Sequence, residues 1–213
     1  MGFDIERALM ALPIFLFSLT VHEFSHGYIA YRLGDPTARD AGRLTLNPLP
    51  HIDLMGALVF VLSNFRFGWA KPVPVMPYNF ADVKKGMLLS AVAGPASNIL
   101  LAFIAGLVFR VVPNMISDIE LATIVAQFLF YAVQINCMLA FFNMIPLPPL
   151  DGSKILFGLL PNKYDHIAVR LERIGPIGLM ILIGIGFITH ISVIWMIIGP
   201  FVSLFITLFT GIR

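Results

Sequence analysis

The sequence predicts an all-α polytopic membrane protein with a three-helix core and about two further transmembrane helices toward its C-terminal end. Composition is the first reason: 58% of the residues are apolar, 12% are charged and the mean hydropathy is +0.89. Such values describe a chain that mostly faces lipid. The second reason is a set of apolar runs long enough for helices that cross the hydrocarbon. These runs are 8–33, 86–111, 121–143 and 174–209.

The first run, 8–33, places two histidines and a glutamate at membrane depth. His22 and His26 are four residues apart, so a helix puts them one turn apart on the same face, with Glu23 beside them. This H-E-x-x-H spacing lets two imidazoles bind zinc while the glutamate takes a proton from water. Histidines that only pack between helices are the alternative. Three ionisable groups in one turn at this depth are costly without a ligand, which favours a metal site.

The connection 34–85 is rich in proline and glycine and holds one apolar run, 52–62. As a helix rising about 1.5 Å per residue, this run is too short to cross, so we expect a re-entrant or short β element between the first two core helices. Within 67–80, alternation over 69–75 indicates an edge strand, which could accept an extended peptide. A solvated loop is the alternative there. His51 could line an entrance, but an ordinary loop histidine is favoured.

Basic residues are distributed unevenly about the predicted spans. If 52–62 does not cross, twelve of the fourteen basic residues lie on one side, and only Arg7 and Arg110 lie opposite. The positive-inside rule makes the richer side cytoplasmic. We therefore predict five spans with the N-terminus outside, the last two at about 174–190 and 191–211, with the break near His190–Ser192. The net charge of +2 gives no indication of a nucleic-acid partner.

Small residues recur at every fourth position along the second span, which favours close helix packing. They are Ser90, Gly94, Asn98, Ala102 and Gly106. Polar residues mark one face of the third span and should turn toward protein or water. They are Gln127, Tyr131 and Gln134, with Asn136 and Asn143 further on. Hydrogen bonds between helices suffice to explain Gln127 and Gln134.

A catalytic zinc site needs a third protein ligand. Two spans, 86–111 and 121–143, return the chain to the side on which the first helix ends, so Asp151 can meet His22 and His26. Glu120 falls on the opposite side and Glu172 in a later basic connection, which makes both weaker candidates. Three prolines in the segment 143–152 break any helix there. Irregular backbone at this depth is tolerated where protein or water satisfies its polar groups, as around a cavity.

Three motifs in order resemble the site-2 protease family of intramembrane zinc metalloproteases. They are HEFSH at 22–26, GPASN at 94–98 and N-x-x-P-x-x-x-L-D-G at 143–152. The resemblance covers 8–152 and implies one Zn²⁺ per chain, held by His22, His26 and Asp151, with Glu23 as the catalytic base. It also implies a polar role for Asn143 near the scissile carbonyl, a zinc toward the cytoplasmic side and substrates with transmembrane segments. We expect a multi-pass protein of a prokaryotic cell membrane.

The whole chain, 1–213, is expected to form a single integral membrane protease domain, with a core at 8–152 and C-terminal helices within 174–211. Some members of the family have a helix before the H-E-x-x-H helix, or a PDZ domain, so a compact form is predicted. The alternative function is metal binding without proteolysis, in a cation transporter or an inactive homologue. A transporter needs a continuous polar path, and an inactive homologue would usually have lost a ligand or the base. Both considerations favour a zinc-dependent endopeptidase of unknown substrate and oligomeric state.

Overall fold

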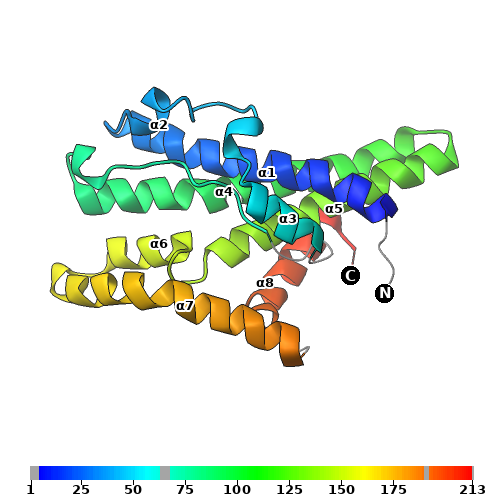
Figure 1. Cartoon of the computed structure of the whole chain (residues 1–213). Helices are drawn as coiled ribbons and strands as arrows, with labels where there is room; N and C mark the ends of the chain where they lie inside the picture. Colours follow the sequence, from blue (N-terminus) through cyan, green and yellow to red (C-terminus); the bar gives the residue numbers. More distant parts are fainter. Residues whose placement is uncertain (1–4, 63–67, 190–191, 213) are drawn as a thin grey trace.

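The computed structural model describes residues 5–62, 68–189 and 192–212, and Figure 1 shows that helices dominate them. Short 3₁₀ turns lie at Leu49–His51, Pro77–Asn79, Val112–Met115 and Asn162–Tyr164. The α-helices are α1 Ile5–Arg32, α2 Thr37–Asp40, α3 Leu54–Leu62, α4 Val83–Val111, α5 Ile119–Asn143, α6 Asp151–Leu159, α7 Asp165–Thr189 and α8 Val193–Thr210.

Polar side chains define where three of the long helices begin. Asp82 accepts a hydrogen bond from Lys85 N at the start of α4, and Asp118 accepts one from Leu121 N at the start of α5. Ser192 does the same for Trp195 N at the start of α8. These caps satisfy backbone donors that have no partner within the helix. The last cap starts α8 close to the predicted break in the run 174–209, although 190–191 lie outside the described residues.

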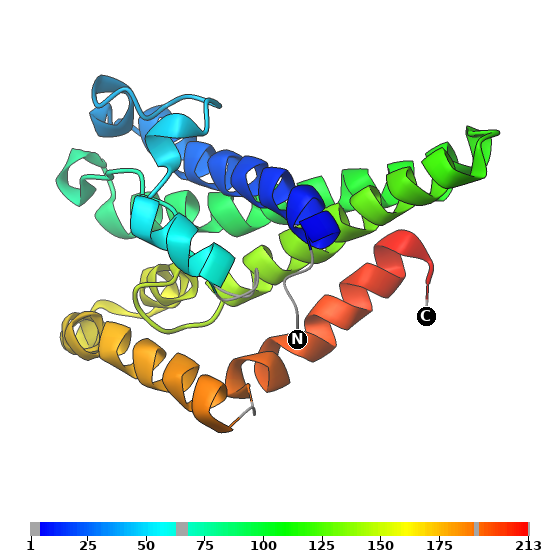
Figure 2. The same ribbon diagram turned by 45° about the vertical axis from the view of Figure 1, so that its right-hand side comes forward.

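Helix α4 lies at the centre of the fold and packs against α1, α5, α6 and α8. The predicted stripe of small residues is buried along its length, from Ser90 to Gly106. A second group of contacts joins α4 and α5 to α8 through Ala102, Val133, Cys137 and Val202. Figure 2 shows α7 and α8 on the side of the molecule opposite α1. The C-terminal helices therefore cover the three-helix core of α1, α4 and α5 on one side.

Arg110 fixes the far end of α8. Its guanidinium donates hydrogen bonds from Nε to the carbonyl of Phe209 (2.8 Å) and from Nη2 to that of Leu208 (2.5 Å). Carbonyls in the last turn of a helix have no partner within the helix, and a cation there also complements the helix dipole. Arg110, which with Arg7 was predicted to lie opposite the other basic residues, thus joins α4 to α8.

Four helical stretches in the described residues are long and apolar enough to cross a membrane. They are Leu9–Arg32, Val83–Met115, Ile119–Asn143 and Val193–Thr210. The chain is thus a multi-pass membrane protein. The described part of the predicted fourth span, 174–189, falls in α7, whose first turns carry Arg170, Glu172 and Arg173. Sixteen residues follow these charges before α7 ends at Thr189, which at about 1.5 Å each is shorter than the roughly 30 Å of hydrocarbon.

The region 52–62 forms the nine-residue helix α3, which packs on α1 by stacking Phe60 on Phe15 with ring centroids 3.8 Å apart. The predicted β element is not found: the described residues contain an isolated antiparallel bridge between Ile52 and Ala70 but no strand. Beyond Ala70 the chain stays extended. Lys71 N still donates to His51 O at 2.9 Å. Further along, the backbone binds side chains instead of a second strand, because Pro72 and Pro74 cannot donate to one. Phe67, the first residue of the predicted stretch, lies outside the described residues.

Substitution of Gly106 tests the packing of α4 on α8. A Cβ at Gly106 would lie 2.7 Å from Phe209 Cβ and 2.8 Å from Phe209 O, and this carbonyl is held by Arg110. Gly106→Ala should therefore destabilise the fold by about 1–3 kcal/mol through overpacking. Thermal unfolding in detergent micelles measures the change. Gly178→Ala is the matched control, because a Cβ there meets nothing within 4 Å; an equal loss in both variants would contradict this packing.

Candidate active site

His22 and His26 of α1 meet Asp151 at the start of α6. The two Nε2 atoms are 3.0 Å apart, and each lies 3.1 Å from Asp151 Oδ2. All three residues are buried, with 3%, 9% and 5% of their surfaces exposed. The structure therefore brings together the three side chains that the sequence singled out as ligands, although 125 or more residues separate Asp151 from the histidines.

The outer nitrogen of each imidazole donates to a fixed acceptor on α4. His26 Nδ1 lies 2.7 Å from the carbonyl of Ser90, which can only accept. His22 Nδ1 lies 2.6 Å from Asn98 Oδ1, and the Asn98 amide nitrogen donates to Ser18 O and to Asn136 Oδ1. Each neutral ring therefore has its proton on Nδ1 and turns the lone pair of Nε2 toward Asp151.

Three acceptors thus converge on one point, and a shared metal ion would satisfy all three. Asp151 contributes its carboxylate to this point through Oδ2, which faces both Nε2 atoms. Its second oxygen, Oδ1, lies 3.6 Å from Lys154 Nζ. Zinc takes nitrogen and oxygen donors at about 2.0–2.2 Å, so donors around one ion approach each other to about 3–3.5 Å. The donor types and their spacing fit zinc.

Gly94 makes room for the two imidazoles. A Cβ on this residue would collide with Nε2 of His26 and Nε2 of His22. The close approach of α4 to α1 therefore depends on a residue without a side chain at this position. The small-residue stripe thus accommodates the site as well as the helix packing.

Glu23 is not part of the His22–His26–Asp151 cluster and contacts the chain at Val73 instead. Its Oε2 accepts a hydrogen bond from Val73 N at 2.8 Å, and the side chain is half-buried. Among the described residues, no group donates to the other oxygen, Oε1. One carboxylate oxygen is therefore anchored, and the other is available to a reactant.

The other candidates lie elsewhere. Asn143 donates from its amide to Leu139 O, 2.9 Å away in the same helix. Glu120 and Glu172 are exposed and do not join the histidine cluster. His51 is buried, and its Nε2 donates to Thr45 O at 2.9 Å, as expected of a loop histidine. His190 lies outside the described residues.

Sequence reasoning missed the residues that orient the imidazoles: Ser90, Asn98 and Asn136. Partners of this kind fix the tautomer and direction of a ligating histidine. Ser90 and Asn98 belonged to the stripe that was interpreted as helix packing, and Asn136 to the polar face of the third span. The available signal was the polarity of Asn98, since packing alone needs only a small residue.

Membrane helices that enclose an H-E-x-x-H pair completed by a carboxylate from another helix define a membrane-embedded metalloprotease. The family model "Peptidase family M50" matches residues 111–185, which contain Asp151 but not the H-E-x-x-H motif. YwhC of Bacillus subtilis, named as a candidate zinc metalloprotease, is 36% identical over 199 residues, 92% of this chain and 88% of YwhC. This chain belongs to peptidase family M50 and is a zinc metalloprotease.

Two more distant relatives carry related names. Rip2 of Mycolicibacterium smegmatis, also named as a candidate zinc metalloprotease, is 28% identical over 68% of this chain and 54% of its own length. Zinc metalloprotease MJ0392 of Methanocaldococcus jannaschii is 26% identical over 78% of this chain and 39% of its own length. This chain therefore spans only part of these two relatives. No solved structure matches it.

Removal of the Asn98 side chain should weaken zinc binding. Asn98→Ala leaves His22 Nδ1 without its acceptor, and loss of such a partner typically lowers metal affinity about 10–100-fold. Titration of purified protein against a chromophoric chelator measures this affinity. Ser97→Ala is the control, because Ser97 Oγ donates to Gly94 O within its own helix. Equal affinity in Asn98→Ala and Ser97→Ala would show that Asn98 does not support the site.

Proposed function

We propose that His22, His26 and Asp151 hold one Zn²⁺ and that Glu23 is the base in hydrolysis of peptide bonds within or near transmembrane helices. The observation that carries this proposal is the convergence of two Nε2 lone pairs and Asp151 Oδ2 at 3.0–3.1 Å. A buried anionic carboxylate among acceptors needs a cation, and H-E-x-x-H with a third acidic ligand is a known zinc peptidase arrangement.

Glu23 moves the proton in this scheme. When bound, zinc supplies a Lewis acid that lowers the pKa of water and polarises the scissile carbonyl. Glu23 Oε1 takes the proton that water gives up as it attacks the carbonyl carbon, and later delivers it to the leaving amine nitrogen. The hydrogen bond from Val73 N to Oε2 holds the carboxylate during both transfers.

The substrate must unwind before it is cut, because a helical peptide bond is hydrogen-bonded and shielded by its own turn. The extended backbone at 70–76 lies beside Glu23 and could align an unwound segment by backbone pairing. Asn143 remains our prediction for a group that binds the substrate carbonyl. Its amide would have to exchange Leu139 O for the substrate, since it now donates within α5.

The charge pattern supports a catalytic site toward the cytoplasm of a prokaryotic cell. His22 and His26 lie in the half of α1 that leads into the basic connection, and Asp151 precedes Lys154 and the basic residues around α7. Both approaches to the site thus carry the excess of Lys and Arg that marks cytoplasmic loops. The whole chain, 1–213, would serve as one protease domain.

A non-proteolytic function has less support. A transporter needs polar groups along a path through the bilayer, and α8 contains no acidic or basic residue. An inactive homologue is expected to lack a ligand or the base, whereas all four groups are present here. We therefore retain the endopeptidase as the proposed function.

The Glu23→Gln substitution tests the base. It keeps the shape of the side chain but cannot accept the proton, so cleavage of a panel of single-span substrates should slow by at least about 100-fold. Zinc content should stay near one per chain, because Glu23 is not among the proposed ligands. Cleavage is followed by mass spectrometry, with and without a chelator. Glu120→Gln is the matched control at an exposed position.

The Asp151→Ala substitution tests the third ligand by metal content. Removal of the carboxylate leaves two imidazoles, so zinc measured by elemental analysis should fall well below that of the wild type. Unchanged zinc stoichiometry in Asp151→Ala would remove Asp151 from the ligand set.

Full cleavage by Glu23→Gln would show that Glu23 is not the base.

A further inference from the structure

The extended segment 70–76 is held beside Glu23 by side chains that precede it in the sequence. Arg43 Nη2 donates to Lys71 O at 2.6 Å, and Val73 N donates to Glu23 Oε2 at 2.8 Å. Met76 N donates to Asp35 Oδ2 at 2.7 Å. Arg43 and Asp35 therefore fix the backbone on both sides of the residue that contacts the base.

Val73 is the residue in this segment best placed for that contact. Pro72 and Pro74 have no N–H, so Val73 carries the one backbone donor between Lys71 and Val75. Its side chain is buried, and a Cβ on Gly27 would lie 3.0 Å from Val73 Cγ1 and 3.0 Å from Ala38 Cβ. Gly27 lies one turn beyond Glu23 on α1, so the packing of Val73 against Gly27 helps to position Val73 N relative to Glu23.

Asp35 is completely buried and joins the segment 70–76 to its own turn. Its Oδ2 accepts from Met76 N, while Oδ1 accepts from Thr37 and from Asn79 Nδ2. Burial alone would raise the pKa of this carboxyl, but hydrogen bonds from Thr37, Asn79 and Met76 lower it. The carboxylate is therefore ionised at neutral pH and holds both ends of the turn that follows Met76.

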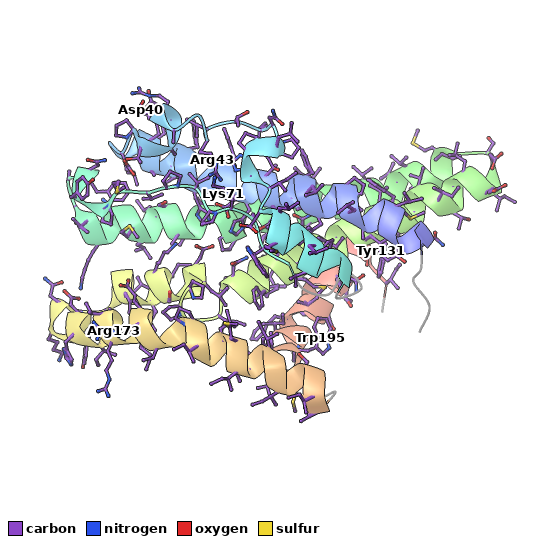
Figure 3. All side chains as sticks on the ribbon, viewed as in Figure 1. Asp40, Arg43, Lys71, Tyr131, Arg173 and Trp195 are labelled. Atoms are coloured by element: carbon purple, nitrogen blue, oxygen red, sulfur yellow. The ribbon has the colours of Figure 1, made fainter. Side chains whose placement is uncertain are left out.

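Arg43 is hard to explain by stability alone. The residue is 8% exposed, and its buried Nε has no hydrogen-bond partner among the described residues. An unmet donor on a buried cation costs free energy, so an apolar side chain would fill this place at lower cost. Figure 3 shows Arg43 and Lys71 close together beside α1, whereas Asp40 lies at the outer edge of the molecule.

We propose that Asp35 and Arg43 are positioning residues for proteolysis: they hold segment 70–76 so that Val73 N–H binds Glu23 Oε2 and leaves Oε1 for the proton of the attacking water. This inference rests on the proposed role of Glu23 as base. Neither residue touches the substrate or the zinc ligands in this scheme. Their loss should lower kcat and leave zinc content unchanged.

Hydrogen–deuterium exchange tests the geometry without a substrate. In detergent micelles the Val73 amide should exchange slowly in the wild type. It should exchange at least about 10-fold faster in Arg43→Gln and Asp35→Asn, because each removes one of the side-chain hydrogen bonds that hold the segment. Arg39→Gln and Asp40→Asn make the same changes in a pair that lies on the exposed surface, and they should exchange as the wild type does. Unchanged protection of Val73 in both test variants would overturn the proposal.

Kinetics then test the link to catalysis with a fluorogenic single-span peptide. Arg43→Gln, Asp35→Asn and Val73→Pro should each lower kcat by at least about 10-fold, with little change in KM or zinc content. Because all three act through one hydrogen bond, Arg43→Gln should have little further effect in a Val73→Pro background. The proposal would be overturned if the kcat loss of the double variant equalled the product of the two single losses. It would also be overturned if Val73→Pro kept full kcat.

Failure of this proposal is distinguishable from failure of the proposed function. If Glu23→Gln cleaves at the wild-type rate, the assignment of the base is wrong. If Glu23→Gln is inactive while Arg43→Gln and Val73→Pro retain full kcat, only the positioning role is wrong. Should Asp35→Asn fail to fold, Arg43→Gln and Val73→Pro still decide, since neither removes a side chain of the buried Asp35 turn.

Discussion

The arrangement of the core depends on bringing the carboxylate of Asp151 against two imidazoles inside a bundle of membrane helices. Water would solvate an exposed carboxylate freely. Here Asp151 Oδ2 lies 3.1 Å from Nε2 of both His22 and His26, and the residue is almost completely buried. The other helices meet requirements set by this contact. Helix α4 provides Gly94 as space and Asn98 as acceptor, and α5 ends early enough for the chain to turn back into α6.

Much of this arrangement could be predicted because it follows from periodicity and from the number of crossings. The spacing of His22 and His26 fixes a common face on any helix, and two intervening spans return Asp151 to the same side. The orienting role of Asn98 could not be predicted in this way. It depends on the rotation of α4 against α1, and a small polar residue in a packing stripe fits a structural role equally well.

Two predictions are not confirmed, and tertiary contacts decide the outcome at both places. Alternation over 69–75 correctly indicates extended backbone, but its partners are the side chains of Glu23, Arg43 and Asp35, which no strand pattern specifies. The count of five spans rested on hydropathy in 174–190. Helix α7 instead starts at Asp165 and carries charges as far as Arg173, so its apolar part is short. The local sequence pattern thus predicted backbone conformation better than it predicted hydrogen-bond partners.

Under the proposed mechanism, Pro72 and Pro74 also limit how a substrate can bind beside Glu23. Between Lys71 and Val75 the segment has one backbone donor, Val73 N–H, and Glu23 already accepts from it. An incoming extended peptide would find only carbonyl acceptors at this point, so it must supply its own N–H groups. A substrate residue without an N–H, proline, could not make this contact. One short sequence, proline-valine-proline, therefore both holds the base and restricts which backbone can align beside it.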